Sequence, residues 1–335
     1  MSSMTAAEAW RRALHADPLP WLLEEETPAV RHVALRWLLD EPESSPAVRR
    51  ASAAAMRADP IAATLAAQHP EGYWARPGPG YTPKYTGTVW SLMFLDQLGA
   101  DPGHAGIRRA CAYVLEHTQT PNGGFGMGSG NSSVVHCLHG NLLRALVGFG
   151  WLDDKCVRAA VEWQAGSITG EGFDSWYRWA TSGPGFSCGI NGGLPCAWGA
   201  IKALRGLARI PPRRRTRSVR RAIADGVELL LSRDPAVADY PAWSRVSPNW
   251  FKLGFPSGYV ADMLQNLEVL AELGHAGDPR LAHAIEVVLS RQDDQGRWRN
   301  EYAYERLTWV PFERQRSASK WVTLRACRVL KAALG

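Results

Sequence analysis

Three cysteines lie in segments where thiol chemistry is conceivable. Cys137 belongs to the run HCLHGN, while Cys188 and Cys196 bracket a glycine-rich segment. With His139 or His136 as a fourth ligand, these thiols would form the Cys₃His set of a tetrahedral zinc site. Residues two apart on a regular helix point about 200° apart, so Cys137 and His139 can share a metal only where the helix is irregular. The alternative is three small buried thiols without a metal.

Acidic side chains offer a second kind of chemistry. Asp262 lies in the apolar segment SGYVADMLQNLEVL. Burial there would raise the pKa of its carboxyl group and make it a proton donor, with Tyr259 close by in the sequence. Asp239, next to Tyr240 in a predicted loop, is a second candidate for the same site. The alternative for Asp262 is an ion pair with a base such as Arg144.

Aromatic residues are the third candidate group, because the chain has 15 tryptophans against nine tyrosines and eight phenylalanines. Ring faces attract positive charge, so aromatic side chains around a cavity can stabilise a cation. For each ring the alternative is packing in the core. The candidates for an apolar binding site are Trp176, Tyr177, Trp179, Trp198, Tyr240, Trp243, Trp250, Phe251, Tyr302, Tyr304 and Trp321.

Positive charge is concentrated in one segment. The net charge is +6, and Arg209–Arg221 holds seven arginines and no acid. This segment is either a solvated connection between helices or a contact for a membrane surface or an anionic group. No nucleic-acid-binding module is recognisable, so we expect no nucleic-acid partner. Arg144, Lys320 and Arg325 fall on predicted apolar helices, where they either pair with acids or face an anionic ligand.

The elements that must position these residues recur along the chain. Four segments share an amphipathic helix, a glutamine near its end and then glycine and an aromatic residue. Three of them fit Gln-x₃-Gly-x-[Phe/Trp] and one carries an insertion. They are Gln68–Trp74, Gln119–Phe125, Gln164–Phe173 and Gln292–Trp298. A fifth helix, over 219–233, has Arg233 in place of the glutamine and lacks the turn. A second, more apolar helix is predicted after each of the five, over 87–99, 133–150, 194–209, 257–274 and 319–334.

Pairs of this kind predict an all-α fold. The apolar helices would form an inner ring, and the amphipathic helices would pack outside it with one face in water. We therefore expect an α/α toroid of about five or six helix hairpins over residues 47–335, with an N-terminal helical extension over residues 1–46. Residues 309–312 are the one candidate for a short strand.

The repeated turns resemble the QW repeats of squalene–hopene and oxidosqualene cyclases and of the β subunits of protein prenyltransferases, families that share the α/α toroid. The segments 250–262 and 319–331 are similar to bacterial proteins with the same repeats. The resemblance implies an apolar, isoprenoid-type substrate in a central cavity. The Asp-x-Asp-Asp and Asp-Asp-x-x-Asp motifs of terpene cyclases are absent from the sequence. An Asp-x-Cys pair that binds zinc in prenyltransferases is matched only in spacing, by Cys137 and His139.

Composition limits the remaining possibilities. Hydrophobic residues make up 46% of the chain and charged residues 21%, which excludes a disordered chain. No apolar stretch is long enough for a membrane-spanning helix, so we expect a cytoplasmic protein, peripheral at a membrane if the arginine-rich segment binds lipid. The leading hypothesis is a terpene-cyclase or prenyltransferase-like enzyme that uses Asp262 or zinc. The alternatives are a non-catalytic toroid that binds a lipid-like ligand or a partner protein, and zinc-dependent thiol chemistry.

Overall fold

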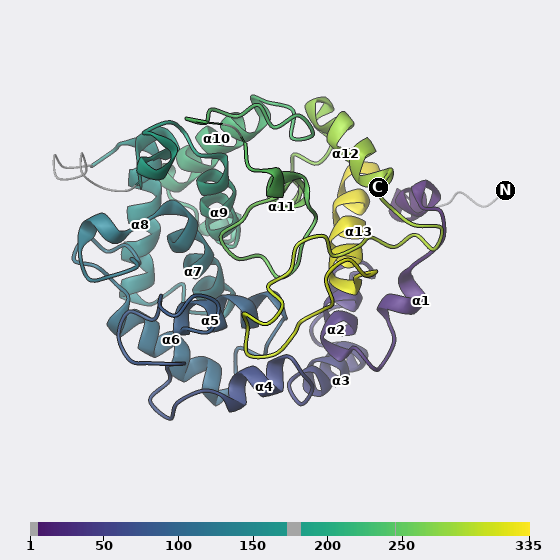
Figure 1. Cartoon of the computed structure of the whole chain (residues 1–335), viewed down its shortest axis with the longest axis horizontal. Helices are drawn as coiled ribbons and strands as arrows, with labels where there is room; N and C mark the ends of the chain where they lie inside the picture. The colour runs from purple at the N-terminus through teal and green to yellow at the C-terminus, as the bar shows by residue number, and fades with distance from the viewer. Residues whose placement is uncertain (1–5, 173–181, 245) are drawn as a thin grey trace.

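The computed structural model describes residues 6–172, 182–244 and 246–335. Helices dominate these residues, and the strands β1 (Ser182–Gly183) and β2 (Ser187–Cys188) form a two-residue antiparallel ribbon. Figure 1 shows the helices arranged as a ring, with an inner and an outer set. The predicted all-α toroid is therefore confirmed. Residues 309–312, the candidate for a short strand, lie in a segment of bends instead.

Helices of the inner set lie side by side around the ring, and most of their residues are buried. Neighbours in this set pack against each other from α5 through α7, α9, α11 and α13 to α2. Gly99, just after α5, lies against Val33 of α2 and closes the circle. The inner helices are α2 (Pro28–Trp37), α5 (Thr88–Gln97), α7 (His136–Gly148), α9 (Ala197–Ala208), α11 (Met263–Glu272) and α13 (Lys320–Leu334).

Outer helices present one face to water and one to the inner set. In α10 the buried residues recur at helical spacing, as in Val219, Ile223, Val227 and Leu230, which is the pattern that the sequence predicts. The outer elements are η1 (Ala6–Ala13), α1 (Leu19–Leu22), α3 (Pro46–Ala55), α4 (Ile61–Ala66), α6 (Ala105–His117), α8 (Lys155–Thr169), α10 (Arg217–Leu231) and α12 (Ala282–Leu289). Single 3₁₀ turns occupy Asn131–Ser133, Pro184–Phe186, Gly189–Asn191, Pro212–Arg214, Pro248–Phe251 and Pro279–Leu281.

The repeated glutamines join consecutive outer helices. Gln68 Nε2 donates to the carbonyl of Gly72 in its own turn (3.1 Å) and to that of Gly106 at the start of α6 (2.9 Å). Gln119 does the same with Gly123 (2.9 Å) and with Cys156 in α8 (2.8 Å). Gln68 and Gln119 thus each close one turn and satisfy a carbonyl of the next outer helix, which sets the angle between successive hairpins. Gln164 differs, because its Nε2 contacts His136 Nδ1 (2.9 Å) and donates to Ser167 Oγ (3.4 Å).

The aromatic residues of these turns attach them to the inner helices. The backbone N–H of Trp74 donates to Thr88 Oγ1 of α5 (3.1 Å), and that of Trp298 donates to Thr323 Oγ1 of α13 (2.9 Å). The indole N–H of Trp74 donates to the Thr64 carbonyl of the preceding helix (2.6 Å). Phe173 of the third turn lies outside the described residues.

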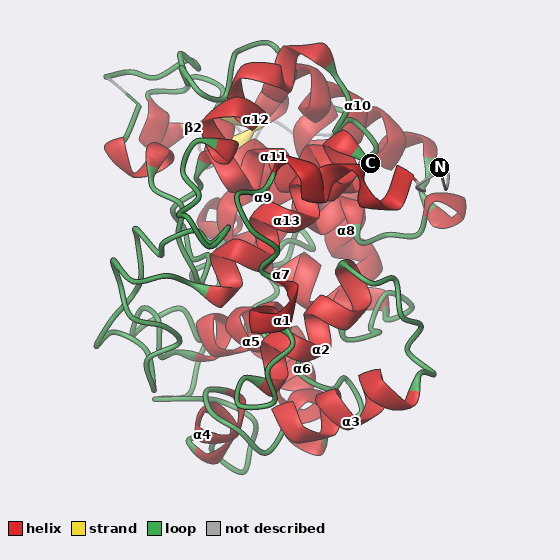
Figure 2. Ribbon diagram, turned by 90° about the vertical axis from the view of Figure 1, so that its right-hand side faces the viewer, coloured by secondary structure: helices red, strands yellow, loops and turns green. Residues whose placement is uncertain are grey.

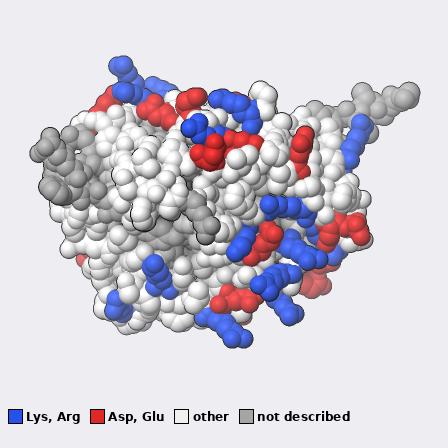
Figure 3. Space-filling view, turned by 45° about the horizontal axis from the view of Figure 1, so that its top comes forward, with Lys and Arg blue, Asp and Glu red and all other residues white. Residues whose placement is uncertain are grey.

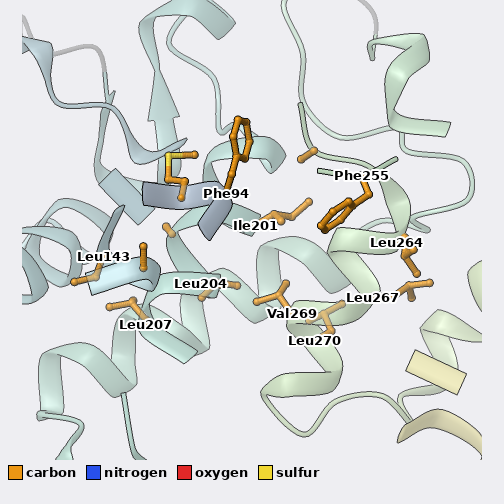
Figure 4. Packing of buried hydrophobic residues seen from close by; sticks show 14 of the residues in the cluster. Phe94, Leu143, Ile201, Leu204, Leu207, Phe255, Leu264, Leu267, Val269 and Leu270 are labelled. Carbon is orange, nitrogen blue, oxygen red and sulfur yellow. The ribbon is translucent and has the colours of Figure 1, made fainter. Parts of the chain in front are cut away.

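Close packing of α7 on α9 brings the two backbones together. A Cβ atom at Gly140 would collide with the backbone carbonyl of Lys202, so only glycine permits this approach. Leu143, Ile201, Leu204 and Leu207 pack around the same contact (Figure 4). The long loops lie on one side of the ring in Figure 2.

The N-terminal helices take part in the ring. The inner helix α2 packs against α13 and α3, and η1 packs against α13. These contacts do not establish where an independently folding unit begins. The division into residues 1–46 and 47–335 therefore stays a prediction.

Candidate functional site

Aromatic side chains gather at the N-terminal ends of the inner helices. Neighbouring ring centroids in this set are 4.4–6.5 Å apart, a separation at which rings attract each other edge-to-face or offset-stacked. Two members, Trp90 and Phe94, belong to α5, Trp321 lies at the start of α13, and the others come from loops. We call these residues the aromatic cluster: Tyr81, Tyr85, Trp90, Phe94, Phe255, Tyr259, Tyr302, Tyr304, Phe312 and Trp321.

Asp262 is buried beside this cluster and caps α11. Its Oδ1 accepts from the backbone N–H of Gln265 (2.8 Å) and its Oδ2 from Gln265 Nε2 (2.9 Å). Only 3% of the residue is exposed. Burial raises the pKa of Asp262, and the charge of Arg325 and the Gln265 hydrogen bonds offset this only in part. Within the described residues Asp262 forms no ion pair, so the alternative that we considered for it is not observed.

Two tyrosines connect Asp262 to the aromatic cluster. The charge of Asp262 contributes to the raised pKa of Tyr304, although burial is the larger cause. The Tyr304 hydroxyl lies so close to Gly258 that a Cβ atom there would collide with it. The ring of Tyr259 lies 5.4 Å from that of Trp90, and burial raises the pKa of Tyr259 and keeps its hydroxyl protonated.

The three predicted thiols meet next to this region. Cys196 begins α9 and accepts from the backbone N–H of Gly199 (3.5 Å). A hydrogen bond with Cys137 and burial raise the pKa of Cys196 to about 12. Cys188 lies on the other side of Cys196, and the hydrogen bond between them together with burial raises the pKa of Cys188. Cys188 and Cys196 are therefore protonated at neutral pH, as small buried side chains would be.

His139 and His136 do not complete a metal site with these thiols. His139 Nδ1 accepts from the backbone N–H of Phe125 (2.9 Å), and Nε2 contacts the Ala160 carbonyl (2.9 Å). His139 thus accepts from the backbone N–H of the aromatic residue in its turn, as Thr88 and Thr323 do at the turns of Trp74 and Trp298. Burial lowers the pKa of His139 to about 3 and that of His136 to about 4. No three His, Cys, Asp or Glu residues in the described part of the chain could hold a metal ion. The zinc site therefore stays a prediction that the residues present do not favour.

Other predicted site residues have mainly structural contacts. Asp239 is exposed and lies 3.8 Å from Arg233, away from the aromatic cluster. The Tyr240 hydroxyl donates to the Leu230 carbonyl (2.7 Å), and the Trp250 indole donates to the Pro235 carbonyl (2.8 Å). These bonds hold the preceding loop against α10.

A small apolar pocket of about 180 Å³ joins several of the predicted residues. Its walls include Cys188, Cys196, Trp198, Tyr240 and Trp250. Two exposed apolar side chains stand beside it: Ile190, at 77% exposure, and Trp243, at 72%. The predicted candidates Trp176, Tyr177 and Trp179 lie outside the described residues.

Charged side chains fill the ring between the inner helices, further from their N-terminal ends than the aromatic cluster. Arg325 of α13 forms a two-point ion pair with Glu268 of α11 (2.9 and 2.6 Å). Arg144 of α7 donates to Asp96 of α5 (3.0 Å). Lys202 of α9 donates to Gln265, and burial lowers the pKa of Lys202 well below its ordinary value. At this level the ring is filled rather than hollow, and Arg144 and Arg325 pair with acids.

The arginine-rich segment has structural contacts as well. Arg214 pairs with Asp153, and Arg221 pairs with Glu171. Arg215 donates to the Ala208 carbonyl near the end of α9 (3.0 Å). On the face shown in Figure 3, basic and acidic side chains are interspersed. No helix in the described residues is long and apolar enough to cross a bilayer, and the membrane contact stays a prediction.

Comparison with known proteins yields remote structural matches. No family model and no curated protein matches the chain. Among solved structures, the type II terpene cyclase MstE from Scytonema is similar at 14% identity and a TM-score of 0.29, over 82% of this chain and 95% of that one. A variant of it in complex with geranylgeranyl dihydroxybenzoate gives 14% identity and a TM-score of 0.33 over the same shares. A variant with merosterolic acid A gives 15% and 0.31, over 82% of this chain and 94% of that one. Superpositions this distant carry no argument about function here.

Sequence reasoning missed part of this site. Tyr302, Tyr304 and Trp321 were predicted to line it, and all three belong to the aromatic cluster. Tyr81, Tyr85, Trp90 and Phe94 were not singled out. Their signal was the crowding of aromatic residues around the start of one predicted inner helix, which is visible in the segment YTPKYTGTVWSLMF.

Proposed function

We propose that this protein binds an apolar, isoprenoid-type molecule at the aromatic cluster and protonates it through Asp262. The observation that carries the proposal is a buried carboxyl group without an ion-pair partner in the described residues, beside ten clustered aromatic rings. A carboxyl group with a raised pKa keeps its proton at a higher pH and can donate it. Ring faces nearby attract the positive charge that protonation of a double bond creates.

The proposed reaction is a cyclisation that begins with protonation of a double bond. The proton of the Asp262 carboxyl group adds to one carbon of a carbon–carbon double bond, whose electron pair forms the new C–H bond and leaves a carbocation at the other carbon. A further double bond of the same molecule attacks that cation and closes a ring. Loss of a proton to water ends the reaction, and solvent returns a proton to Asp262. The faces of Trp90, Tyr259 and Tyr304 would stabilise the cation.

Access to Asp262 requires movement of the loops. The small pocket, of about 180 Å³, has neither Asp262 nor a member of the aromatic cluster in its walls, and it is smaller than the 300–1,000 Å³ that is usual for small-molecule sites. The half-buried rings of Tyr85 and Phe312 belong to the loops that cover α5 and α13. Their displacement would open the cluster, and the exposed Ile190 and Trp243 would contact the apolar molecule first.

A second candidate is a toroid that binds such a molecule without catalysis. The ion pairs that fill the ring favour it, because they leave no deep apolar cavity below the aromatic cluster. In that case Asp262 would serve only as the cap of α11. Both candidates predict that an apolar molecule binds at the aromatic cluster. Only the first predicts that Asp262 transfers a proton to it.

Incubation with squalene or geranylgeraniol in D₂O separates the two candidates. If Asp262 is the acid, a cyclic product carries deuterium, and Asp262→Asn lowers its rate by about 100-fold or more while binding measured by tryptophan quenching persists. Asp239→Asn, at an exposed acid, is the matched control and should keep the wild-type rate. Equal rates in both variants would exclude Asp262 as the acid. Saturable binding without product in any of the three proteins would establish the second candidate.

A further inference from the structure

A second pocket, of about 520 Å³, lies at the end of the ring opposite the aromatic cluster. It opens where α5 and α7 end, between these helices and the N-terminal pair α2 and α3. Asp96, Arg144 and Arg209 form its inner wall, and Arg49 of α3 stands at the outer side. The remaining wall is mixed: Arg36 pairs with Glu43, Asp101 also lines the pocket, and Trp37 and Phe149 are apolar. The proposed acid chemistry does not use this pocket.

Positive charge exceeds negative charge at the inner wall. Arg144 donates to Asp96 (3.0 Å), and Arg209 approaches the same carboxylate at 3.6 Å. A further acid, Glu272, faces both Arg144 (3.7 Å) and Arg328 (3.8 Å). Three guanidinium groups thus share these two carboxylates. Arg144 is buried, whereas Arg209 and Arg328 keep 31% and 26% of their side chains exposed. An excess of partly desolvated charge is costly unless a counter-ion compensates it.

Further buried groups do not supply the missing negative charge. Glu268 is already bound at both oxygens by Arg325. Arg205 is buried nearby, and burial together with the charge of Arg144 lowers its pKa to about 9. The charge of Arg144 is also the largest cause of the lowered pKa of Arg209. Like charges therefore crowd this end of the ring.

Arg209 also has an unused donor. Its Nε atom is buried and has no hydrogen-bond partner in the described part of the chain. Its one ion pair there, with Asp96, has a separation of 3.6 Å, which is too long for a hydrogen bond of good geometry. A buried N–H without an acceptor is rare and destabilising, and a bound ligand would remove that cost. The Arg49 side chain is exposed at the pocket and forms no ion pair in the described residues.

We propose that this pocket binds a phosphate group, held between Arg209 and Arg144 and approached by Arg49. The planar guanidinium fork matches the geometry of phosphate oxygens, and a dianion would compensate the excess charge at the inner wall. The phosphate could belong to a free small molecule or to a phospholipid headgroup at the pocket opening. Its binding does not depend on the function of Asp262.

Isothermal titration calorimetry with inorganic phosphate and with pyrophosphate, at constant ionic strength, tests the proposal. Wild-type protein should bind one of the two anions saturably, and Arg209→Gln should weaken binding at least tenfold. Arg213→Gln is the matched control, because Arg213 belongs to the same arginine-rich segment but is exposed and outside the pocket. Equal affinities in the two variants would overturn the proposal.

A second measurement distinguishes the sources of phosphate. Co-sedimentation with vesicles of phosphatidylcholine, with and without phosphatidic acid, tests the headgroup; binding that needs phosphatidic acid and is lost in Arg209→Gln assigns the site to lipid. Absence of binding to both anions and to both vesicles would overturn the proposal. If Arg209→Gln does not fold, as judged by circular dichroism, Arg49→Gln replaces it. Arg49→Gln must then bind more weakly than Arg213→Gln, and equal affinities would again refute the site.

Discussion

The side-chain amide of Gln292 donates a hydrogen bond to the carbonyl of Ala13, 279 residues earlier in the chain (3.1 Å). The amide oxygen of Gln292 accepts from the backbone N–H of His15 (2.7 Å). Gln68 and Gln119 make the equivalent donation to the next outer helix along the chain. The glutamine of the fourth repeat binds the N-terminal segment instead, and it joins the two ends of the ring.

Gln292→Ala should therefore loosen the N-terminal segment. Loss of its two hydrogen bonds to this segment and of a third to the Leu289 carbonyl would cost about 2–4 kcal/mol in the free energy of unfolding, measured by urea denaturation. Limited proteolysis should release the first residues of the chain faster than in the wild type. Gln68→Ala is the control, because it loses similar bonds but leaves the two ends joined. Equal protection of the N-terminal segment in both variants would contradict this account of ring closure.

The Arg325–Glu268 pair predicts a strong and non-additive effect. Glu268 is only 5% exposed, so Glu268→Ala would leave the Arg325 guanidinium buried without its partner and lower the free energy of unfolding by about 3–5 kcal/mol. The double substitution Glu268→Leu with Arg325→Met should cost less than the sum of the two single ones, because it removes both charges together. Chemical denaturation of the four proteins provides the cycle, and simple additivity would show that the pair is not coupled.

His139 predicts a dependence of stability on pH. Its pKa is lowered from 6.5 to about 3, so the unfolded state binds the proton more tightly than the folded state. The stabilisation is fully present above pH 6.5 and decreases as the pH falls towards 3, by about 1.4 kcal/mol per pH unit within this window. His139→Asn, which keeps an acceptor for Phe125, removes this contribution. Denaturation curves at pH 7 and pH 5 should show a smaller difference for the variant, and equal differences would refute the role.

Gly140 predicts a steric effect. Gly140→Ala places a methyl group on the Lys202 carbonyl and forces α7 and α9 apart, which we expect to lower the melting temperature and to cost about 1–3 kcal/mol or more. Gly277→Ala is the control, since no atom lies within 4 Å of the added methyl group. Thermal unfolding of both variants is the measurement. A Gly140→Ala protein as stable as the control would mean that the two helices do not approach so closely.

The sequence alone determined the elements and their order. Alternation of amphipathic and apolar helices with Gln-x₃-Gly-x-[Phe/Trp] turns predicts the inner and outer sets, because each turn contains its own hydrogen-bonding groups and each helix its own apolar stripe. The convergence of Cys137, Cys188 and Cys196 was predictable for the same reason, since two neighbouring inner helices begin at these residues. The burial of Asp262 followed from the apolar run around it.

Tertiary structure alone decided which side chains face one another across the ring. Sequence spacing locates a residue on its own helix but does not give the distance between helices that are far apart in the chain. His139 therefore resembled a metal ligand, and only the folded chain shows that both its ring nitrogens contact backbone atoms of Phe125 and Ala160. The partners of Arg144 and Arg325, and the crowding of arginines beside Asp96, likewise depend on how five of the six inner helices, α5, α7, α9, α11 and α13, pack around the ring. Electrostatic and packing energies depend on the distances between side chains of different helices. These distances are fixed only when the ring closes.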